Sequence, residues 1–222
     1  MTGAGSEETW VNRAELPGWL APLIDRAGTI SPSEFSPLVP PQPQGNARGA
    51  AVLLLFWEDE SGDIRVLLIQ RSEELRAHAG QPAFPGGAID PTDADAAAAA
   101  VREAVEETGL DPAGVEVLAT LPDLSVPVSG FTVTPVLAWW REPSPVAPAD
   151  LNEVASVHLV RVADLVDPAN RLVVRHFSGR ISPAFDVDGI RVWGFTAFVL
   201  DRVLSLAGWE QPWDSNRIED IT

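Results

Sequence analysis

The chain has 222 residues, of which 45% are hydrophobic and 21% charged, a composition typical of a globular protein and unlike that of a disordered chain. Its formal net charge of −17 argues against broad binding to nucleic-acid backbones or to anionic lipid surfaces. The absence of cysteine excludes disulfides, thiolate zinc sites and a cysteine nucleophile, and it fits a reducing compartment. Any anionic ligand must therefore be met by local arginines or by metal ions.

The longest apolar stretch, Ala50 to Trp57, is far shorter than the roughly 20 residues that a transmembrane helix requires. The amino terminus is acidic and polar, whereas a secretory signal begins with basic residues followed by an apolar segment. We therefore expect a cytoplasmic protein with no membrane and no nucleic-acid partner.

Residues 1–48 are predicted to form an N-terminal arm that ends in a proline-rich linker. A short helix is expected around Glu7 to Ile24, broken at Pro17 and Gly18, and four prolines between Ser36 and Gln44 favour an extended chain. The apolar residues of this arm could let it reach across a homodimer. The main domain is expected over residues 49–208, followed by a C-terminal tail over residues 209–222.

The main domain begins with a predicted β-hairpin, because two apolar strand-like runs, 50–57 and 64–72, flank a polar turn. A helix is predicted over residues 93–109, with acidic residues at its start and a glycine at its end. Further strands are predicted at 115–121, 131–140, 154–160, 171–177 and 181–187, before a final helix at about 192–206. This order predicts an α/β (α+β) fold with a mixed β-sheet sandwiched between helices.

One face of the helix predicted at 93–109 carries three carboxylates. At about 100° per residue, Glu103, Glu106 and Glu107 fall within an arc of about 100°, while alanine and valine side chains point the other way. A solvated acidic face is the ordinary interpretation. However, the glutamates lie near the carboxyl end of the helix, where the helix dipole disfavours anions, so their clustering favours a bound cation. Hard divalent cations such as Mg²⁺ or Mn²⁺ take carboxylate oxygens as ligands.

Gly86 and Gly87 precede this helix, and glycine permits tight turns and close approach of the backbone to a ligand. Together with the helix sequence R-E-A-V-E-E-T-G-L from Arg102 to Leu110, they closely resemble the signature of Nudix hydrolases, whose box ends R-E-U-x-E-E-x-G-U with U aliphatic. The spacing departs from the family pattern, because Gly87 stands one residue further from Arg102 than usual. Asp93 best matches the expected intervening glutamate, and its role is left open.

The residues upstream narrow this resemblance. The segment LLIQRSEELRAHAGQPAFPGG, Leu67 to Gly87, is similar to the pattern L-L-T-x-R-[SA]-x3-R-x3-G-x3-F-P-G-G of the coenzyme A pyrophosphatase branch, with Ile69 in place of threonine. The resemblance spans about residues 50–206. It implies a Nudix-type fold and the hydrolysis of coenzyme A or its thioesters to 3′,5′-ADP and 4′-phosphopantetheine or its acyl derivative, with Mg²⁺ or Mn²⁺ as cofactor.

The resemblance also implies roles for the box residues. Glu106 and Glu107 would be metal ligands, Glu103 a metal ligand or the general base, and Gly87 a carbonyl ligand. Arg102 would orient the glutamates by charge-assisted hydrogen bonds, and the alternative is a surface ion pair at helical spacing.

Residues outside the box are also implicated. Glu153 is a candidate base or metal ligand from a later loop, and a solvent-facing strand-edge glutamate is equally compatible with its position. Arg71 and Arg76, with Gly86, are candidate contacts for substrate phosphates, and the two arginines could instead pair with carboxylates. His78, His158 and His176 are interpreted as surface or structural residues.

Two other functions stay open. One is a Nudix hydrolase of another nucleoside diphosphate derivative, such as ADP-ribose or a nucleotide sugar, against which the upstream arginine pattern weighs. The other is a non-catalytic Nudix-fold binding module, against which the intact Glu103, Glu106 and Glu107 weigh.

Overall fold

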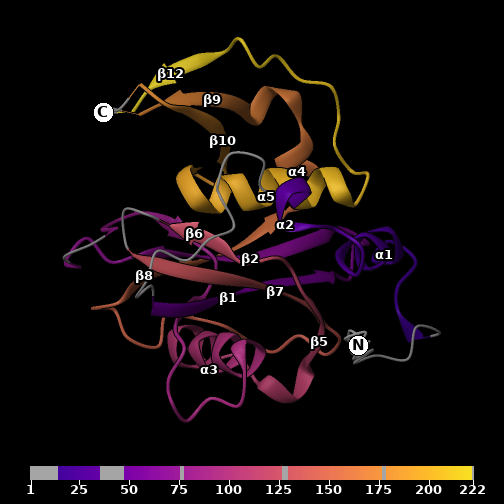
Figure 1. Ribbon diagram of the computed structural model, residues 1–222, viewed down its shortest axis with the longest axis vertical. Helices are drawn as coiled ribbons and strands as arrows, with labels where there is room; N and C mark the ends of the chain where they lie inside the picture. Colours follow the sequence, from indigo (N-terminus) through magenta and orange to yellow (C-terminus); the bar gives the residue numbers. More distant parts are fainter. Residues whose placement is uncertain (1–14, 36–47, 76–77, 127–129, 177–178, 222) are drawn as a thin grey trace, which may run out of the picture.

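The structure is a computed structural model that describes residues 15–35, 48–75, 78–126, 130–176 and 179–221. Its elements stack in four layers (Figure 1): helix α3 (Ala96–Thr108), a large mixed sheet, helix α5 (Gly194–Leu206) and a smaller second sheet. The predicted mixed sheet between helices is confirmed. The sequence had not predicted that the strands after residue 170 would form a sheet of their own.

The large sheet is built around β1 (Arg48–Glu58), which pairs antiparallel with β2 (Ile64–Arg71) in the predicted hairpin and parallel with β7 (Phe131–Trp140). The other strands are β3 (Pro82–Ala83), β4 (Gly86–Ala88), β5 (Val115–Thr120), β6 (Leu124–Val126) and β8 (Val154–Arg161). β8 pairs with β2, and β4 pairs with β1. β1 is apolar along most of its length because both of its faces are covered by helices.

The second sheet has the strand order β11 (Ile190–Val192), β10 (Ile181–Val187), β9 (Arg171–Arg175) and β12 (Ile218–Asp220). β9 and β10 lie where the sequence predicts strands. β12 comes from the segment interpreted as a tail, and it pairs parallel with β9.

Helix α3 confirms the predicted helix, although it begins at Ala96 because the Asp95 side chain accepts a hydrogen bond from the Ala98 N–H and caps it. It ends at Gly109, which adopts a left-handed conformation with φ 68°. The structure corrects the first helix: α1 covers Ala21–Ala27, because the chain turns at Pro17 and Gly18 before the helix starts. The rest of that prediction, residues 7–14, and the linker residues 36–47 lie outside the described residues.

Two short α-helices were not predicted, α2 (Pro32–Phe35) and α4 (Val162–Val166), nor were two single-turn 3₁₀ helices, η2 (Pro112–Gly114) and η3 (Pro168–Asn170). Among the described residues, no helix combines the length and the apolar character needed to cross a membrane.

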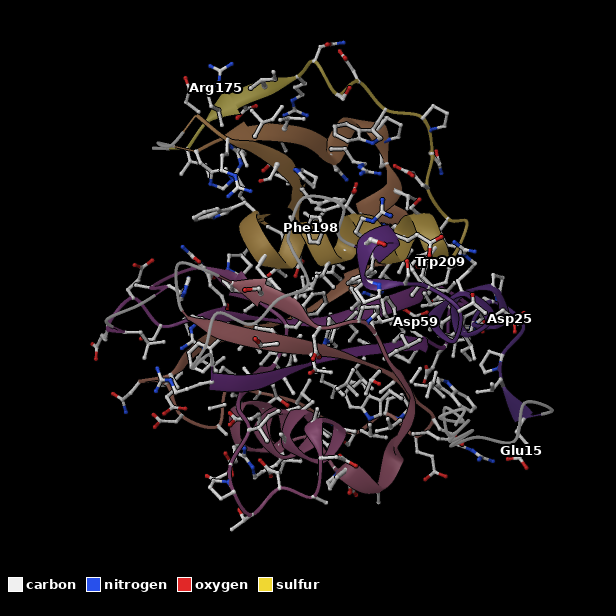
Figure 2. The ribbon with its side chains drawn as sticks, viewed as in Figure 1. Glu15, Asp25, Asp59, Arg175, Phe198 and Trp209 are labelled. Atoms are coloured by element: carbon white, nitrogen blue, oxygen red, sulfur yellow. The ribbon has the colours of Figure 1, made fainter. Side chains whose placement is uncertain are left out.

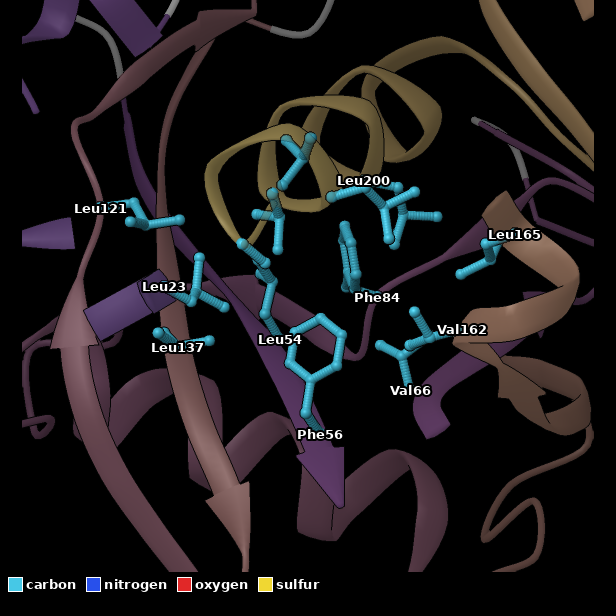
Figure 3. Close-up of a cluster of buried hydrophobic side chains, with 14 of the residues drawn as sticks. Leu23, Leu54, Phe56, Val66, Phe84, Leu121, Leu137, Val162, Leu165 and Leu200 are labelled. Carbon is cyan, nitrogen blue, oxygen red and sulfur yellow. The ribbon is translucent and has the colours of Figure 1, made fainter. Parts of the chain in front are cut away.

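The hydrophobic core has one layer on each side of the large sheet. Figure 3 shows the layer toward α5, where Leu54 and Phe56 of β1 meet Leu200 of α5 and Leu23 of α1. On the other face, Leu53 and Leu55 pack toward α3, whose alanines let the helix lie close to the sheet. Alternate side chains of β1 therefore point into the two core layers on opposite faces of the sheet.

The described part of the predicted arm packs on the main domain. The ring of Trp209, which follows α5, lies 6.0 Å from that of Trp19 and 5.9 Å from that of Phe56 of β1, at the edge marked by Trp209 in Figure 2. The guanidinium of Arg202 donates to the carbonyl oxygens of Glu34 at 2.7 Å and Phe35 at 3.1 Å. This segment contributes buried side chains to the core, namely Leu20, Leu23, Ala27, Ile30 and Phe35.

The second sheet is fixed by a buried arginine. The side chain of Arg171 is fully buried and pairs with Asp201 of α5 and with Glu210 at 3.2 Å. Its guanidinium also lies 4.3 Å from the ring of Trp213 and 5.1 Å from that of Phe185. One cation therefore joins β9, α5 and the segment that leads to β12.

We predict that Arg171→Ala lowers the free energy of unfolding by about 3 kcal/mol or more, because it leaves carboxylates without their buried partner. Urea denaturation measures this loss. Arg175→Ala on the same strand is the matched control, since its pair with Asp220 is exposed and contributes less than about 1 kcal/mol (Figure 2). Equal losses in the two variants would contradict the role of Arg171.

Candidate active site

The last turn of α3 buries a carboxylate beside the glycine turn. The side chain of Glu107 is 6% exposed, and its Oε2 accepts a hydrogen bond from the N–H of Gly86 at 2.9 Å. Arg71 of β2 places its Nη1 3.9 Å from the Oε1 of Glu107. Burial raises the pKa of Glu107 to about 7, although the Gly86 N–H and Arg71 both oppose this shift.

Gly86 and Gly87 leave no room for side chains. A Cβ atom on Gly86 would overlap the carbonyl oxygen of Ala51 in β1, and the backbone there has φ 154°. A Cβ atom on Gly87 would lie 2.5 Å from the carboxylate of Glu103. The glycine pair therefore brings the backbone directly against both β1 and the acidic face of α3.

The approach to this turn is anchored in the core. Phe84 is 2% exposed and points into the cluster between the sheet and α5 (Figure 3). The carbonyl oxygen of Pro85 accepts a hydrogen bond from the N–H of Leu53 at 2.8 Å. The turn is thus fixed immediately before Gly86.

Arg102 lies between the glutamates and the loop that precedes α3. Its Nη1 donates to Glu106 at 2.9 Å and lies 3.0 Å from Oε1 of Glu103. Its Nε and Nη2 donate to the two carboxylate oxygens of Asp93, each at 3.0 Å, and Nη2 also donates to the carbonyl oxygen of Ala88 at 3.2 Å. Arg102 therefore contacts both neighbouring glutamates, and its role in orienting them stays a prediction.

The structure shows the contacts of Asp93, whose role the sequence left open. Its carboxylate accepts both Arg102 bonds and the N–H of Asp90 at 2.7 Å. The bonds from Arg102 hold the pKa of Asp93 below its usual range.

Glu153 immediately precedes β8, and its charge acts on the same carboxylates. Its negative charge, with smaller weight than burial, raises the pKa of both Glu103 and Glu107. Its backbone carbonyl accepts the N–H of Ser72 at 2.9 Å, which ties the end of β2 to the start of β8. The structure therefore brings Glu153 toward Glu103 and Glu107, while its side chain is exposed.

The remaining candidates have different positions. Arg71 belongs to the site through Glu107, whereas Arg76 lies outside the described residues. His78 is exposed, and its Nδ1 lies 2.9 Å from Oε1 of Gln81. His158 and His176 each hydrogen-bond a serine within their own sheet.

The arrangement fits a hard divalent cation. In the part of the chain that the structure describes, no group of three or more histidine, aspartate or glutamate side chains is already gathered as a metal cage, and Arg102 pairs with both Glu103 and Glu106. The donors nevertheless are carboxylate oxygens, one of them is buried with a raised pKa, and the space beside Gly87 is kept free of a side chain. Glu103, Glu106 and Glu107 are the residues that would hold the ion.

A family model, the NUDIX domain, matches residues 47–183, and the chain belongs to the Nudix family. This family comprises hydrolases that act on pyrophosphate bonds and generally use divalent ions such as Mg²⁺ or Mn²⁺.

The chain is similar to two proteins described as uncharacterized Nudix hydrolase NudL. The protein of Klebsiella pneumoniae is 47% identical over 140 residues, which cover 60% of this chain and 67% of that protein. The protein of Escherichia coli K12 is 53% identical over 93 residues, which cover 41% of this chain and only 46% of that protein. Among solved structures, the Nudix hydrolase RenU of M. smegmatis has a TM-score of 0.50 at 24% identity, covering 72% of this chain and 86% of that one, which supports the fold alone.

We predict that Gly87→Ala weakens Mn²⁺ binding roughly tenfold or more while the protein stays folded, because the new methyl group displaces the flexible carboxylate of Glu103. Titration of Mn²⁺ by electron paramagnetic resonance measures the affinity. Gly86→Ala is the comparison, since its methyl group meets backbone and should lower stability instead. Unchanged Mn²⁺ affinity in Gly87→Ala would show that Glu103 does not hold the ion.

The metal-free protein should lose stability as pH rises from about 4.5 to about 7, because the carboxyl of Glu107 keeps its proton more tightly when folded than when unfolded. The loss is on the order of 3 kcal/mol at most. It is measured as the difference between wild type and Glu107→Gln in chemical denaturation with chelator present. Parallel pH profiles for the two proteins would contradict the buried carboxylate.

Proposed function

We propose that the protein hydrolyses the diphosphate bond of coenzyme A or its thioesters, giving 3′,5′-ADP and 4′-phosphopantetheine or its acyl derivative. The observation that carries this proposal is the buried Glu107, held by the N–H of Gly86 beside Glu103 and Glu153. Such a concentration of carboxylate repels a diphosphate unless cations are bound between them.

Each residue has a distinct part in this proposal. Bound Mg²⁺ or Mn²⁺ would neutralise the diphosphate oxygens and lower the pKa of an attacking water. Glu106 and Glu107 would hold the cations, with Glu103 as a further ligand or as the base, and Gly87 would offer its carbonyl oxygen. Glu103 or Glu153 would accept the proton of the water, because both lie close enough for their charges to act on Glu107.

The choice of coenzyme A is supported by the upstream pattern and by the place of Arg71. A chain with a net charge of −17 has no long-range attraction for a polyanionic substrate, so recognition must come from arginines close to the ligand. Arg71 lies beside Glu107, and its Nε is buried without a hydrogen-bond partner. This position supports a contact of its guanidinium with a phosphate held at the carboxylates, and Arg76 is proposed to act with it.

Product identification by mass spectrometry on a panel of coenzyme A, acetyl-coenzyme A, ADP-ribose and NADH tests the function. We expect 3′,5′-ADP from the coenzyme A substrates, and no turnover in excess EDTA. Glu106→Gln should lower kcat roughly a hundredfold or more with the fold intact, because it removes a ligand charge. Preference for ADP-ribose would indicate another nucleoside diphosphate substrate, and no turnover of any compound would indicate a binding module.

Arg71→Ala should lower kcat/KM by roughly 1–3 kcal/mol in transition-state free energy, the range of hydrogen bonds to charged groups. Equal losses for coenzyme A and dephospho-coenzyme A would place the contact at the diphosphate, and a loss for coenzyme A alone would place it at the 3′-phosphate. Thermal denaturation provides the control. If neither substrate is affected, or if the variant unfolds, Arg71 is a structural partner of Glu107.

A further inference from the structure

The strand that leads into the glycine turn is weakly held by its own ladder. β3 has two residues, which pair with Ile69 and Gln70 of β2. Its first residue, Pro82, has no N–H to donate. Such a strand requires other anchors if it is to hold a fixed position, because a single short ladder is marginal in water.

Two side chains supply anchors at backbone carbonyls. Nε2 of Gln70 donates to the carbonyl oxygen of Gly80 at 3.3 Å, just before β3. The hydroxyl of Thr196, in the first turn of α5 and 5% exposed, donates to the carbonyl oxygen of Pro82 at 3.0 Å. The loop end is therefore held from the large sheet and from the helix above it.

The first anchor continues as a chain of polar contacts to the second sheet. Oγ of Ser156 in β8 lies 3.2 Å from Oε1 of Gln70 and 2.8 Å from Nε2 of His158. Nδ1 of His158 lies 2.8 Å from Oδ2 of Asp188, in the tight turn between β10 and β11. The chain thus connects the hairpin of the second sheet to Gly80.

Counting donors fixes one end of this chain. The Gly80 carbonyl can only accept, so Gln70 turns its amide nitrogen toward it and its oxygen toward Ser156. The single hydroxyl proton of Ser156 goes either to Gln70 or to Nε2 of His158, depending on the tautomer of the imidazole. The serine, histidine and aspartate have the spacing of a nucleophilic triad, so the test below includes an assay for a nucleophilic serine.

We propose that Gln70, Ser156, His158 and Thr196, called the β3 clamp below, are positioning residues that hold β3 and thereby place Gly86 and Gly87 against α3 for divalent-cation binding. This inference rests on the proposed metal-dependent function. Three residues separate Pro82 from Gly86, and buried Phe84 is one of them. A shift of β3 is therefore transmitted to the Gly86 N–H that contacts Glu107.

Four variants test the clamp. Ser156→Ala removes the link between His158 and Gln70, and Thr196→Val removes the other anchor while keeping the side-chain shape. Ser156→Thr keeps the hydroxyl. Ser182→Ala is the matched control, because Ser182 makes the same contact, 2.8 Å, with His176 within the second sheet.

Two measurements are made on the full chain: Mn²⁺ affinity by electron paramagnetic resonance, and hydrogen exchange of residues 80–88 by mass spectrometry. We expect Ser156→Ala and Thr196→Val to weaken Mn²⁺ binding roughly three- to tenfold, less than loss of a direct partner of a ligand. Exchange in residues 80–88 should quicken, whereas α3 should keep wild-type protection. Ser156→Thr and Ser182→Ala should match wild type in both measurements.

Three results would overturn the inference: unchanged Mn²⁺ affinity in both Ser156→Ala and Thr196→Val, the same losses in Ser182→Ala, or hydrolysis of p-nitrophenyl acetate that disappears in Ser156→Ala, since that would make Ser156 a nucleophile. A wild-type protein that binds no Mn²⁺ would contradict the proposed function. Hydrogen exchange would then decide separately, because unchanged exchange of residues 80–88 overturns the clamp and faster exchange supports it.

Discussion

The absence of side chains at Gly86 and Gly87 is the constraint on which the candidate site depends. Because a methyl group at Gly86 would overlap β1, the turn can lie directly against the central strand, and its N–H reaches the carboxylate of Glu107. Because Gly87 is equally bare, Glu103 can occupy the space beside it. The sheet, the glycine turn and the helix therefore all meet at Gly86 and Gly87. The small residues of α3 allow the helix to lie this close to the sheet.

Helix α5 and the second sheet, which lie on the other side of the large sheet from α3, help to hold the glycine turn in place. Helix α5 covers the core layer on its side of the large sheet, and buried Phe84 packs in that layer. Thr196 of α5 also donates a hydrogen bond to the Pro82 carbonyl of β3. The second sheet is joined to α5 by the buried Arg171. The described part of the N-terminal arm is attached to α5 because Arg202 of that helix donates hydrogen bonds to the carbonyl oxygens of Glu34 and Phe35. Elements without any carboxylate of the site thus fix the backbone on which the site is built.

The sequence predicted what is determined locally. The cap at Asp95 and Gly109 limits α3, and helical geometry alone places Glu103, Glu106 and Glu107 on one face. It could not predict β3, β4 or β12, because strands of two or three residues are defined by their partners and carry no periodicity. It also gave no sign that Arg171 is buried, since arginine in a strand is ordinarily expected at the surface and its partners come from distant segments. The contacts of Asp93 likewise needed the folded loop.

Arg102 illustrates how narrowly one position can be specified. A guanidinium has five N–H groups arranged in a plane, and the five contacts of Arg102 engage its Nε, Nη1 and Nη2 on both edges of that plane. A lysine would carry the same charge, yet its three protons sit on one atom and cannot reach the loop carbonyl, the aspartate and both glutamates together. A positive charge alone is therefore insufficient at this position, because the surrounding acceptors require the planar shape of the guanidinium as well.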